Sequence, residues 1–432
     1  MRSRSMLPMS WDYEPLKFHV TFSKGLAIQK SDLIDEGIAV VNYGQIHAKS
    51  NSGVHLANDL VRYIPLRFAL QSASARLHRG DVVYADTSED INGVGNAVFI
   101  DSSGEIFAGY HTLTCRPDGT ALLGDYLAFL SQSDWWRAQL RSMVMGVKVY
   151  SITKSIMSRV WIPLPPLREQ QRIVSRLNSI CDEIDNSTHT IEGQISALER
   201  YRASVIYEAV TKGLNSDVPM KSSGIDWIGG IPEGWELNKL KYADHFISDF
   251  LQENTSPDFK FRYVDIGSVA YGIGIKNYTE MNFGDSPSRA RKRVANGDTI
   301  VSTVRTYLKA IAMITDDDDL IVSTGFSVIR PYMHLPKYLY YLCCSELFCQ
   351  QVEKYAWGIA YPAIGEKLLG GIWVPVPPKD VQEDIVSYLD NQTSAIDAVL
   401  ETKRRQIEVL KRRRQSLIYE YVTGKRRVGK EI

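Results

Sequence analysis

The amino-acid sequence predicts an α+β protein made of a tandem duplicated module, in which each copy is an α/β domain followed by a long α-helix. Three observations predict this fold: a repeat offset by 212 residues, a proline cluster that opens each copy of the repeat, and a seven-residue apolar spacing behind each cluster. We expect the two helices to form an antiparallel coiled coil with pseudo-twofold symmetry. The expected segments are a first α/β domain at 1–160, a central helical segment at 161–214, a linker and second α/β domain at 215–372, and a C-terminal helical segment at 373–432.

The α/β domains are predicted from short apolar runs bounded by turn residues. The first copy contains "DVVYAD", "NAVFID" and "HTLTC", and the second contains "DTIVSTV", "AIAMIT" and "FSVIRP". We expect one helical segment to close each domain, at 124–144 and at 336–356. Weaker echoes pair "WDYEPLKF" at Trp11 with "WELNKLKY" at Trp235, and "RGDVV" with "NGDTI".

The repeat itself is strongest between 161–211 and 373–423, which match without a gap and are identical at 23 of 51 positions. The copies open on "WIPLPP" and "WVPVPP", and these prolines force an extended lead-in before any helix begins. Only two copies at so long a period indicate a duplicated module rather than a solenoid.

A narrow apolar seam follows each proline cluster and predicts a partner helix. Ile385 and Val399 join the seam of the second copy, whereas Lys403 and Gln406 interrupt it. About 45 residues at 1.5 Å each make a rod of roughly 65 Å, which would hold two domains at a fixed distance. The alternative is two unrelated amphipathic helices, each packed on its own domain. The seam positions at heptad spacing are Leu177, Ile184, Ile191, Leu198, Val205, Leu389, Ile396, Leu410 and Leu417.

Composition places the chain among ordinary globular proteins, since 44% of its 432 residues are hydrophobic and 23% are charged. No apolar signal region follows the first arginines and no run of 18 apolar residues occurs, so we expect a cytoplasmic protein without a membrane partner. The cysteines are odd in number and lack CxxC spacing, which favours buried thiols over a disulfide framework or a metal site. They are Cys115, Cys181, Cys343, Cys344 and Cys349.

Three stretches together resemble the specificity (S) subunit of type I restriction-modification systems. They are "IPLPPLREQ" from Ile162, "GIDWIGGIPEGWELNKL" from Gly224, and "WVPVPPKDVQ" from Trp373. The resemblance implies two target recognition domains, each reading one half of a bipartite double-stranded DNA sequence. It further implies that the helices set the spacer between the halves and dock two methyltransferase (M) subunits, with restriction (R) subunits as possible further partners. The second copy departs from the first in one place, where Lys-Asp-Val replaces Leu-Arg-Glu.

Catalytic motifs are missing from the sequence. It has no Asn/Asp-Pro-Pro-aromatic tetrad, no Walker A loop and no HExxH, and its "GVG" and "GIGI" fragments are typical of turns. We therefore expect a non-catalytic subunit without a cofactor of its own. By the resemblance, S-adenosylmethionine belongs to the methyltransferase partner, and ATP and magnesium belong to the nuclease partner. The alternatives are a stand-alone DNA-binding nuclease and a coiled-coil scaffold that does not bind DNA.

Candidate DNA-binding residues of the second module lie around a predicted hairpin at "SRARKRVANGDTIVSTVRTYLKAIAMI". Its charge run suits phosphate contacts. Arg305 and Tyr307 are expected on one face after an apolar strand, where they could read base edges. The set comprises Arg289, Arg291, Lys292, Arg293, Arg305, Tyr307 and Lys309, with Tyr361 from the later loop "WGIAYPAIGEK".

The first module offers the positional equivalent, "YADTSEDINGVGN", after its matching Gly-Asp strand. If Asp86 reads a base, it would accept a hydrogen bond from cytosine N4. The loop "MGVKVYSITKS" leads straight into the proline segment, as does its counterpart, so both loops are expected to face DNA. The set comprises Lys49, Arg62, Asp86, Thr87, Ser88, Asn92, Lys148, Tyr150 and Lys154.

Overall fold

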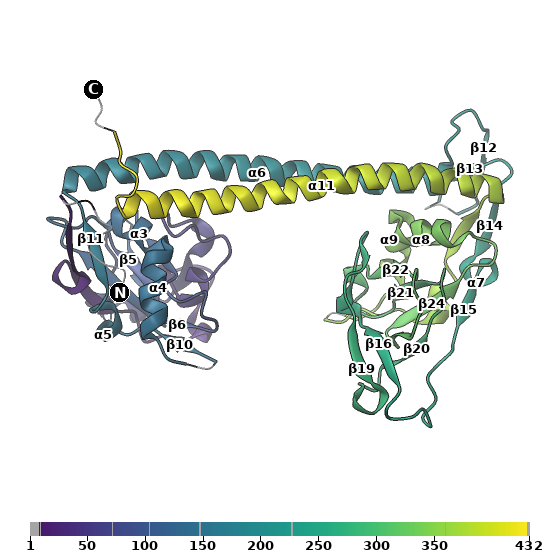
Figure 1. The fold of residues 1–432 in the computed structure, drawn as a ribbon, viewed down its shortest axis with the longest axis horizontal. Helices are drawn as coiled ribbons and strands as arrows, with labels where there is room; N and C mark the ends of the chain where they lie inside the picture. Colours follow the sequence, from purple (N-terminus) through teal and green to yellow (C-terminus); the bar gives the residue numbers. More distant parts are fainter. Residues whose placement is uncertain are drawn as a thin grey trace. The chain divides into compact units, whose positions relative to one another are not determined.

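A computed structural model of the chain describes residues 8, 10–70, 72–102, 104–146, 148–225, 228–358 and 360–429. The chain forms two compact units. Unit 1 comprises 1–191 and 405–432, and unit 2 comprises 192–404. Each unit holds one α/β domain and a segment of both long helices, α6 (Leu167–Lys212) and α11 (Lys379–Val422) (Figure 1).

Unit 1 is built on a four-stranded antiparallel sheet and a three-stranded sheet. The first has the order β2 (Val20–Lys24), β9 (Thr112–Pro117), β5 (Val82–Ala85), β7 (Ala97–Phe99); the second has the order β4 (Arg62–Ile64), β3 (Ile38–Val41), β8 (Ile106–Ala108). Helices α3 (Gly124–Gln132) and α4 (Asp134–Met143) follow, and α3 packs on β5 and β7. Short elements complete the unit: α1 (Tyr43–Ile46), α2 (Leu66–Ala69), α5 (Lys154–Met157), and the pair β6 (Thr87–Ser88) and β10 (Tyr150–Ser151).

Unit 2 contains two four-stranded sheets. Their orders are β15 (His245–Ile247), β24 (Phe326–Arg330), β21 (Thr299–Ser302), β22 (Ile311–Met313), and β19 (Thr279–Asn282), β16 (Lys260–Val264), β23 (Leu320–Ser323), β20 (Ala290–Arg293). Helices α8 (Pro336–Cys344) and α9 (Glu346–Tyr355) follow the sheets, and α8 packs on β21 and β22. The short elements are α7 (Leu240–Ala243), α10 (Glu366–Leu369), and the pairs β12 (Met220–Ser222) with β13 (Gly230–Pro232) and β17 (Val269–Ala270) with β18 (Gly274–Ile275).

The weak sequence echoes mark equivalent structural parts of the two units. The tryptophan-led echo forms β1 (Asp12–Pro15), which pairs antiparallel with β11 (Trp161–Leu164). Its counterpart β14 (Glu236–Lys239) pairs antiparallel with β25 (Trp373–Val376). Each proline cluster is therefore held as an extended strand by the strand that opens its own domain.

The "RGDVV" and "NGDTI" echo fixes a buried carboxylate in each unit. Asp81 accepts two hydrogen bonds from Arg116 at 2.8 and 2.7 Å, and Asp298 accepts two from Arg330 at 2.8 Å each. Both aspartates are almost completely buried, so the bidentate arginine supplies the charge and the donors that an isolated buried carboxylate lacks. The shared Gly-Asp dipeptide thus has a structural role.

The single helical segment predicted to close each domain is wrong in detail, because each segment contains two helices. Ser133 separates α3 from α4, and Ser345 separates α8 from α9; both serines have extended backbone. Each serine hydroxyl accepts from a backbone N–H in the first turn of the next helix, of Trp136 and of Phe348. This N-cap stabilises a new helix start and thereby the break in the segment.

The glutamine shared by both proline clusters is buried and bridges three backbone groups. Gln170 accepts from Leu123 N–H at 2.9 Å and donates to the carbonyls of Ala121 and Pro165. Gln382 makes the matching bonds to Leu335, Met333 and Pro377. The same side chain therefore ties the domain to the start of the long helix in each unit.

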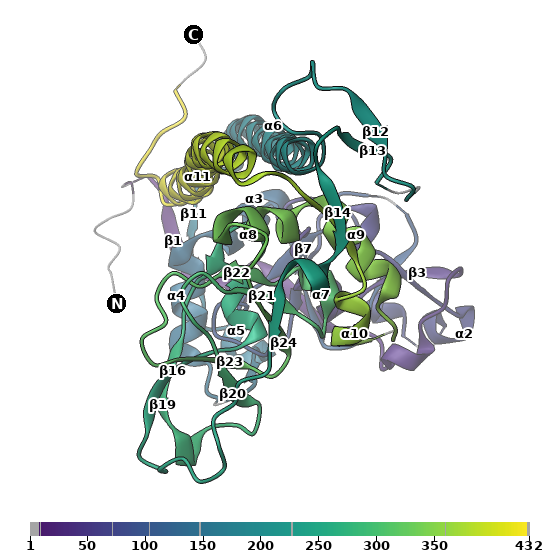
Figure 2. The same ribbon diagram turned by 90° about the vertical axis from the view of Figure 1, so that its right-hand side faces the viewer.

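The predicted antiparallel pairing of the long helices is present within each unit, and Figure 2, which looks along both helices, shows α6 and α11 side by side. In unit 1, Arg414 lies 3.6 Å from Asp185 and Arg427 lies 2.9 Å from Glu169. In unit 2, Arg404 lies 3.1 Å from Glu199, and Arg202 lies 3.1 Å from Asp397. In both units the residue number rises along one helix as it falls along the other. The Asp–Arg pair of unit 1 and that of unit 2 come from the same positions of the repeat.

The seam is largely as predicted, with one correction in the second helix. Leu400 and Ile407 are buried and carry the seam past the predicted interruption, whereas Val399 is 44% exposed and does not belong to it. Val399 has the same heptad position as the buried Ile385, two heptads earlier, but at this point of α11 the neighbouring Leu400 is the buried residue. Of the predicted seam residues, Leu177, Ile184, Val205, Leu389, Ile396 and Leu417 are buried, and Ile191, Leu198 and Leu410 are half-buried.

Candidate nucleic-acid interface

Two loops meet at the surface of each domain, and they are the same two in both units. In unit 2, the β21–β22 connection meets the segment after α9, where Ile364 N–H donates to Thr303 O at 2.8 Å. In unit 1, the β5–β7 connection meets the segment after α4, where Ile152 N–H donates to Asp86 O at 2.7 Å. Ile152 and Ile364 are matched positions of the repeat. We call these the paired loops of each unit: 86–96 with 144–146 and 148–153 in unit 1, and 303–310 with 356–358 and 360–365 in unit 2.

The paired loops of unit 2 expose large aromatic side chains beside an arginine. Tyr307, Tyr361 and Trp357 are 56%, 64% and 75% exposed. The Arg305 guanidinium lies 5.0 Å from the centre of the Tyr361 ring, and Trp357 bridges to Ala363 in the same loop. Exposed aromatic rings next to a guanidinium group are suited to stacking on bases and to contacting phosphate.

The expectation that Arg305 and Tyr307 share a strand face is wrong. Strand β21 ends at Ser302, Arg305 has a left-handed φ of 52°, and Tyr307 lies in a 3₁₀ turn, Thr306–Leu308. Lys309 at the other end of that turn also has a left-handed φ, of 46°. Two non-glycine residues in this region within one connection indicate a tightly constrained loop. The loop, rather than a strand pleat, therefore sets the direction of both side chains.

The charge run of unit 2 divides into exposed and engaged residues. Arg289 and Arg293 are exposed, whereas Arg291 packs on the Phe283 ring. Lys292 is 5% exposed, and its ammonium donates to Glu366 and to the Phe326 carbonyl, both at 2.8 Å. Arg291, Lys292 and Arg293 lie on strand β20, and of these three only Lys292 is buried. Lys292 therefore has a structural role and leaves the set of candidate DNA contacts.

Lys309 is also engaged. Its ammonium lies 3.5 Å from Glu346 and 3.6 Å from Glu353 of helix α9. These carboxylates neutralise the charge, so Lys309 fixes its loop to the domain and is a weaker candidate for a phosphate contact.

The paired loops of unit 1 are polar and more acidic. Asp86 accepts from the Thr87 hydroxyl at 2.8 Å, and Ser88 is buried with its hydroxyl donating to Asp90 O at 2.7 Å. Ser88 is therefore a structural residue, whereas Asn92 is exposed. The predicted cations Lys49, Arg62, Lys148 and Lys154 are all exposed, and Tyr150 is half-buried in β10, where it pairs with Ser88.

Four ring-bearing residues beside this loop were missed by the sequence reasoning. Tyr43 lies 5.5 Å from Tyr110 and 5.4 Å from His111, centre to centre, and His47 bonds to Thr87 O at 2.8 Å. Burial, reinforced by Tyr43, raises the pKa of Tyr110, so its phenol stays protonated. Tyr43 and His47 line a pocket of about 480 Å³ together with Asn92 and Asn96. The signal available in the sequence was the aromatic dipeptide Tyr110-His111 between two apolar runs, and the left-handed φ of 54° at His111 shows that a turn lies there.

Within the described ranges, no group of three or more His, Cys, Asp or Glu side chains is arranged to hold a metal ion. Nor is any helix of that part of the chain long and apolar enough to cross a membrane. All five cysteines are buried, as predicted.

Two α/β domains with equivalent paired loops, joined to antiparallel long helices, define the class of this protein: a duplicated protein with one surface site per domain. The chain belongs to the family described as the type I restriction modification DNA specificity domain, whose profile matches residues 24–197 and 249–409. This confirms the resemblance that the proline motifs indicated. Proteins of this family are specificity subunits, which are non-catalytic components of type I restriction-modification systems.

Curated relatives share this organisation over most of their length. The chain is 26% identical over 344 residues to the type I restriction enzyme MjaVIII specificity subunit of Methanocaldococcus jannaschii, covering 76% of this chain and 77% of that protein. It is 24% identical over 362 residues to the putative MjaX specificity subunit of the same organism, covering 82% and 80%. A solved structure concerned with complex assembly and conformational transition of the type I R-M system has a chain of the same fold. Its TM-score is 0.70 and its identity is 19% over 97% of this chain and 99% of that one.

Proposed function

We propose that this chain is the DNA sequence-recognition subunit of a type I restriction-modification complex, with 1–160 and 215–372 as its target recognition domains. Each domain would read one half of a bipartite DNA target through its paired loops. One observation carries the proposal: the two units repeat the same skeleton, including the capping serine and the buried glutamine, yet present different side chains on equivalent loops. A duplicated frame with divergent surface loops suits the reading of two different half-sites.

In unit 2 the readers would be Arg305, Tyr307 and Tyr361, with Arg289 and Arg293 positioned for phosphate. The three reading side chains lie on the paired loops and are exposed. Arginine reads guanine through O6 and N7, and aromatic rings stack on bases. The paired loops of unit 2 would therefore contact bases through one arginine, which hydrogen-bonds, and two tyrosine rings, which stack.

In unit 1 the readers would be polar and uncharged or acidic. Asn92 and Thr87 can contact base edges, and Asp86 can accept from cytosine N4. The exposed cations Lys49, Arg62, Lys148 and Lys154 would provide phosphate contacts, with Tyr150 beside them. The two domains would thus recognise their half-sites with different chemistry.

The long helices would set the spacer between the half-sites and dock two methyltransferase subunits. In that assembly the methyl donor S-adenosylmethionine belongs to the methyltransferase, and ATP and magnesium belong to any restriction subunit. The two long helices differ in sequence at their first turns, where a methyltransferase subunit would dock. Glu169 accepts from the Trp11 indole at 3.0 Å and from Arg427 at 2.9 Å, whereas the matched Val381 cannot accept a hydrogen bond. The two docking surfaces are therefore expected to differ.

The test is an exchange of residues 230–372 for the matching domain of a relative. Methylome sequencing of cells that carry the exchanged chain with its partners should show one half of the target changed and the other retained. A change in both halves would contradict independent reading by the two domains. Cleavage of DNA by the chain alone with magnesium would favour the nuclease alternative, and duplex binding that is absent or insensitive to salt would favour the scaffold.

A further inference from the structure

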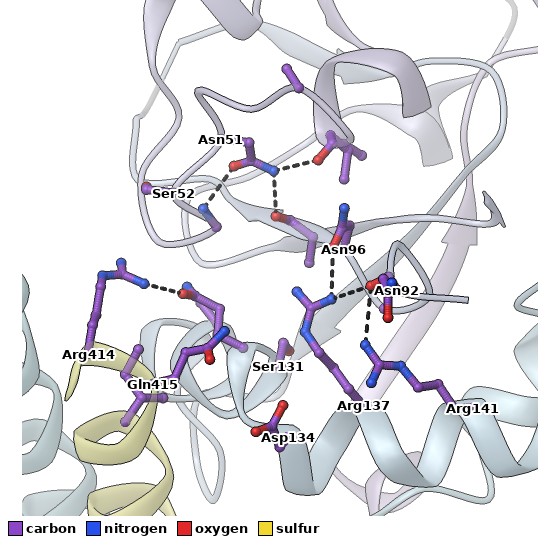
Figure 3. A pocket seen from close by; sticks show the side chains of 18 residues that line it. Asn51, Ser52, Asn92, Asn96, Ser131, Asp134, Arg137, Arg141, Arg414 and Gln415 are labelled. Carbon is purple, nitrogen blue, oxygen red and sulfur yellow. Dashed lines mark hydrogen bonds between the residues drawn. The ribbon is translucent and has the colours of Figure 1, made fainter. Parts of the chain in front are cut away.

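Two arginines of helix α4 form a cation pair without a carboxylate partner. Arg137 and Arg141 are four residues apart, so they share one helix face, where like charges disfavour the helix. Arg137 donates to Asn92 O at 3.1 Å and to Asn96 Oδ1 at 2.9 Å, and Arg141 donates to Asn92 O at 3.3 Å (Figure 3). Every acceptor is neutral, and neither arginine forms an ion pair with a carboxylate of the described chain.

Both arginines line a pocket of about 540 Å³ in unit 1, and Figure 3 shows Arg414 of α11 at the same pocket. Asn51 also lines the pocket, but its amide already donates to the carbonyls of Ile46 and Ala97. Two buried donors have no hydrogen-bond partner, Gln132 Nε2 and Arg414 Nε, although Asp185 lies 3.6 Å from the latter. Unpaired buried donors are costly, and an acceptor-rich ligand would satisfy them.

The electrostatic surroundings of Arg137 also favour a bound anion in this pocket. Burial lowers the pKa of Arg137, and the neighbouring Arg141 lowers it further, while Asp134 opposes the shift. Asp134 is the one carboxylate among the residues that line the pocket. A bound anion would remove the repulsion between the two guanidinium groups, and a tetrahedral oxyanion presents several acceptors to them at once.

We propose that this pocket binds an oxyanion of the phosphate class between Arg137 and Arg141, with Arg414 and the Gln132 amide completing the site. Both arginines also hold the backbone of Ile91 and Asn92, in the paired loop of unit 1. The bound anion therefore fixes that loop, a role in recognition that rests on the proposed function. The phosphate comes either from the DNA backbone or from a free phosphate ester.

Unit 2 meets the same need without an external ion. The positions matched to Arg137 and Arg141 are Cys349 and Glu353. Glu353 and Glu346 neutralise Lys309, which lies in the paired loop of unit 2. The second helix of each domain thus holds its loop, through an internal ion pair in unit 2 and through a cation pair that needs an anion in unit 1.

Inorganic phosphate titrated into the full-length chain, followed by ³¹P NMR, tests the site. We expect saturable binding that Arg141→Gln weakens about tenfold, as for the loss of one charge-assisted contact. The matched control Arg172→Gln, at an exposed position of α6, should change the affinity less than about twofold. No saturable binding by the unaltered chain would overturn the proposal.

A second variant keeps both arginines and their bonds to the loop. Ser52 lines the pocket, and Ser52→Asp places a carboxylate there that competes with phosphate. It should weaken binding at least about tenfold, whereas Ser50→Asp, at an exposed position outside the pocket lining, should not. If all four variants and the unaltered chain bound phosphate equally well, phosphate would bind outside this pocket and the proposal would be wrong.

Adding a DNA duplex distinguishes the two sources of phosphate. Release of bound phosphate by duplex identifies the backbone as the occupant, and retention identifies a free phosphate ester; both outcomes support the site. Because the phosphate titration uses no DNA, its failure leaves the proposed DNA recognition standing, and a failure of DNA recognition leaves the phosphate result standing.

Discussion

At the scale of single residues, burial decides the role of a charged or polar side chain more than its identity does. Arg289 and Lys292 belong to one charge run, but the first is exposed and the second is ion-paired inside unit 2. A lysine that is buried and paired stabilises the loop or strand it joins, while an exposed arginine stays available for phosphate. The candidate DNA contacts therefore reduce to the exposed members of each set.

Replacing Arg305 by alanine should weaken duplex binding by about 1–3 kcal/mol and relax the base preference at one position of one half-site, because a bidentate base contact is lost. The measurement is fluorescence anisotropy with the assembled complex on the cognate duplex and on single-base variants. Lys292→Ala serves as the contrast, since it should lower the stability of the protein without altering base preference. An equal loss of affinity on all sequences for Arg305→Ala would reassign this residue to phosphate.

The cysteines should resist thiol reagents in the folded protein. Burial raises the pKa of Cys344 to about 12 and raises that of Cys115 well above its ordinary value, and the thiolate is the reactive form. At pH 8 we therefore expect almost no reaction with Ellman's reagent until denaturant is added, when five thiols should react. Rapid reaction of any thiol under native conditions would contradict their burial.

At the scale of elements, the buried glutamine and the heptad seam define the long helices. Gln170 and Gln382 each satisfy three backbone groups where a domain meets a helix, and the seam residues bury the contact between helices. These positions recur in both copies because each unit needs the same joint. The side chains of the paired loops, by contrast, differ between the two units.

Gln382→Leu should lower the free energy of unfolding by about 3 kcal/mol, because it leaves the Leu335 N–H and two carbonyls buried without partners. Urea unfolding followed by circular dichroism measures the change. The control is Gln171→Leu, at an exposed position of α6, which should change stability by less than about 0.5 kcal/mol. A similar loss of stability in both variants would contradict a stabilising role of the buried Gln382 amide.

Leu389→Ala should destabilise unit 2 by about 2–5 kcal/mol, since it opens a cavity in the buried seam. Val399→Ala on the same helix should cost less than about 1 kcal/mol, because this side chain is exposed and outside the seam. Thermal unfolding of the two variants compares them directly. A larger loss of stability in Val399→Ala than in Leu389→Ala would show that Val399 belongs to the seam, as the sequence pattern predicted.

At the scale of the whole molecule, each unit is closed by a helix segment from the other copy of the repeat. The Tyr126 hydroxyl donates to the Val422 carbonyl at the end of α11, and the Tyr338 hydroxyl donates to the Val210 carbonyl near the end of α6. These four residues are two matched pairs of the repeat. Neither domain therefore completes its core from its own copy alone, and the two copies are expected to fold together.

Adding one heptad to each long helix, after Ile191 and after the matched Lys403, should lengthen the spacer of the DNA target. Seven residues add about 10 Å of helix, roughly three base pairs of B-DNA, and a whole heptad preserves the seam. Methylome sequencing should then show both half-sites retained and the spacer longer. A seven-residue insertion into the linker at 213–219 is the control, and an unchanged spacer after the helix insertion would refute the proposed role of the helices.

The sequence by itself determined the parts of this protein that repeat. Proline clusters, heptad spacing and the 212-residue offset predicted the duplicated α+β fold and the antiparallel helix pair, because these features depend on local backbone constraints and on periodicity. It also placed Arg305, Tyr361 and Asn92 in segments that the structure shows to be exposed loops, since those segments follow recognisable strands.

Only the tertiary structure decided which of those side chains are free to bind. Lys292 and Ser88 are buried, Val399 faces outward, and the left-handed turn at Arg305 replaces the expected strand face. The tertiary fold also brought Arg137 and Arg141 against Asn92, some 45 to 49 residues earlier in the chain. Burial and such long-range contacts depend on how strands and helices pack together, and a single sequence carries no local signal for them.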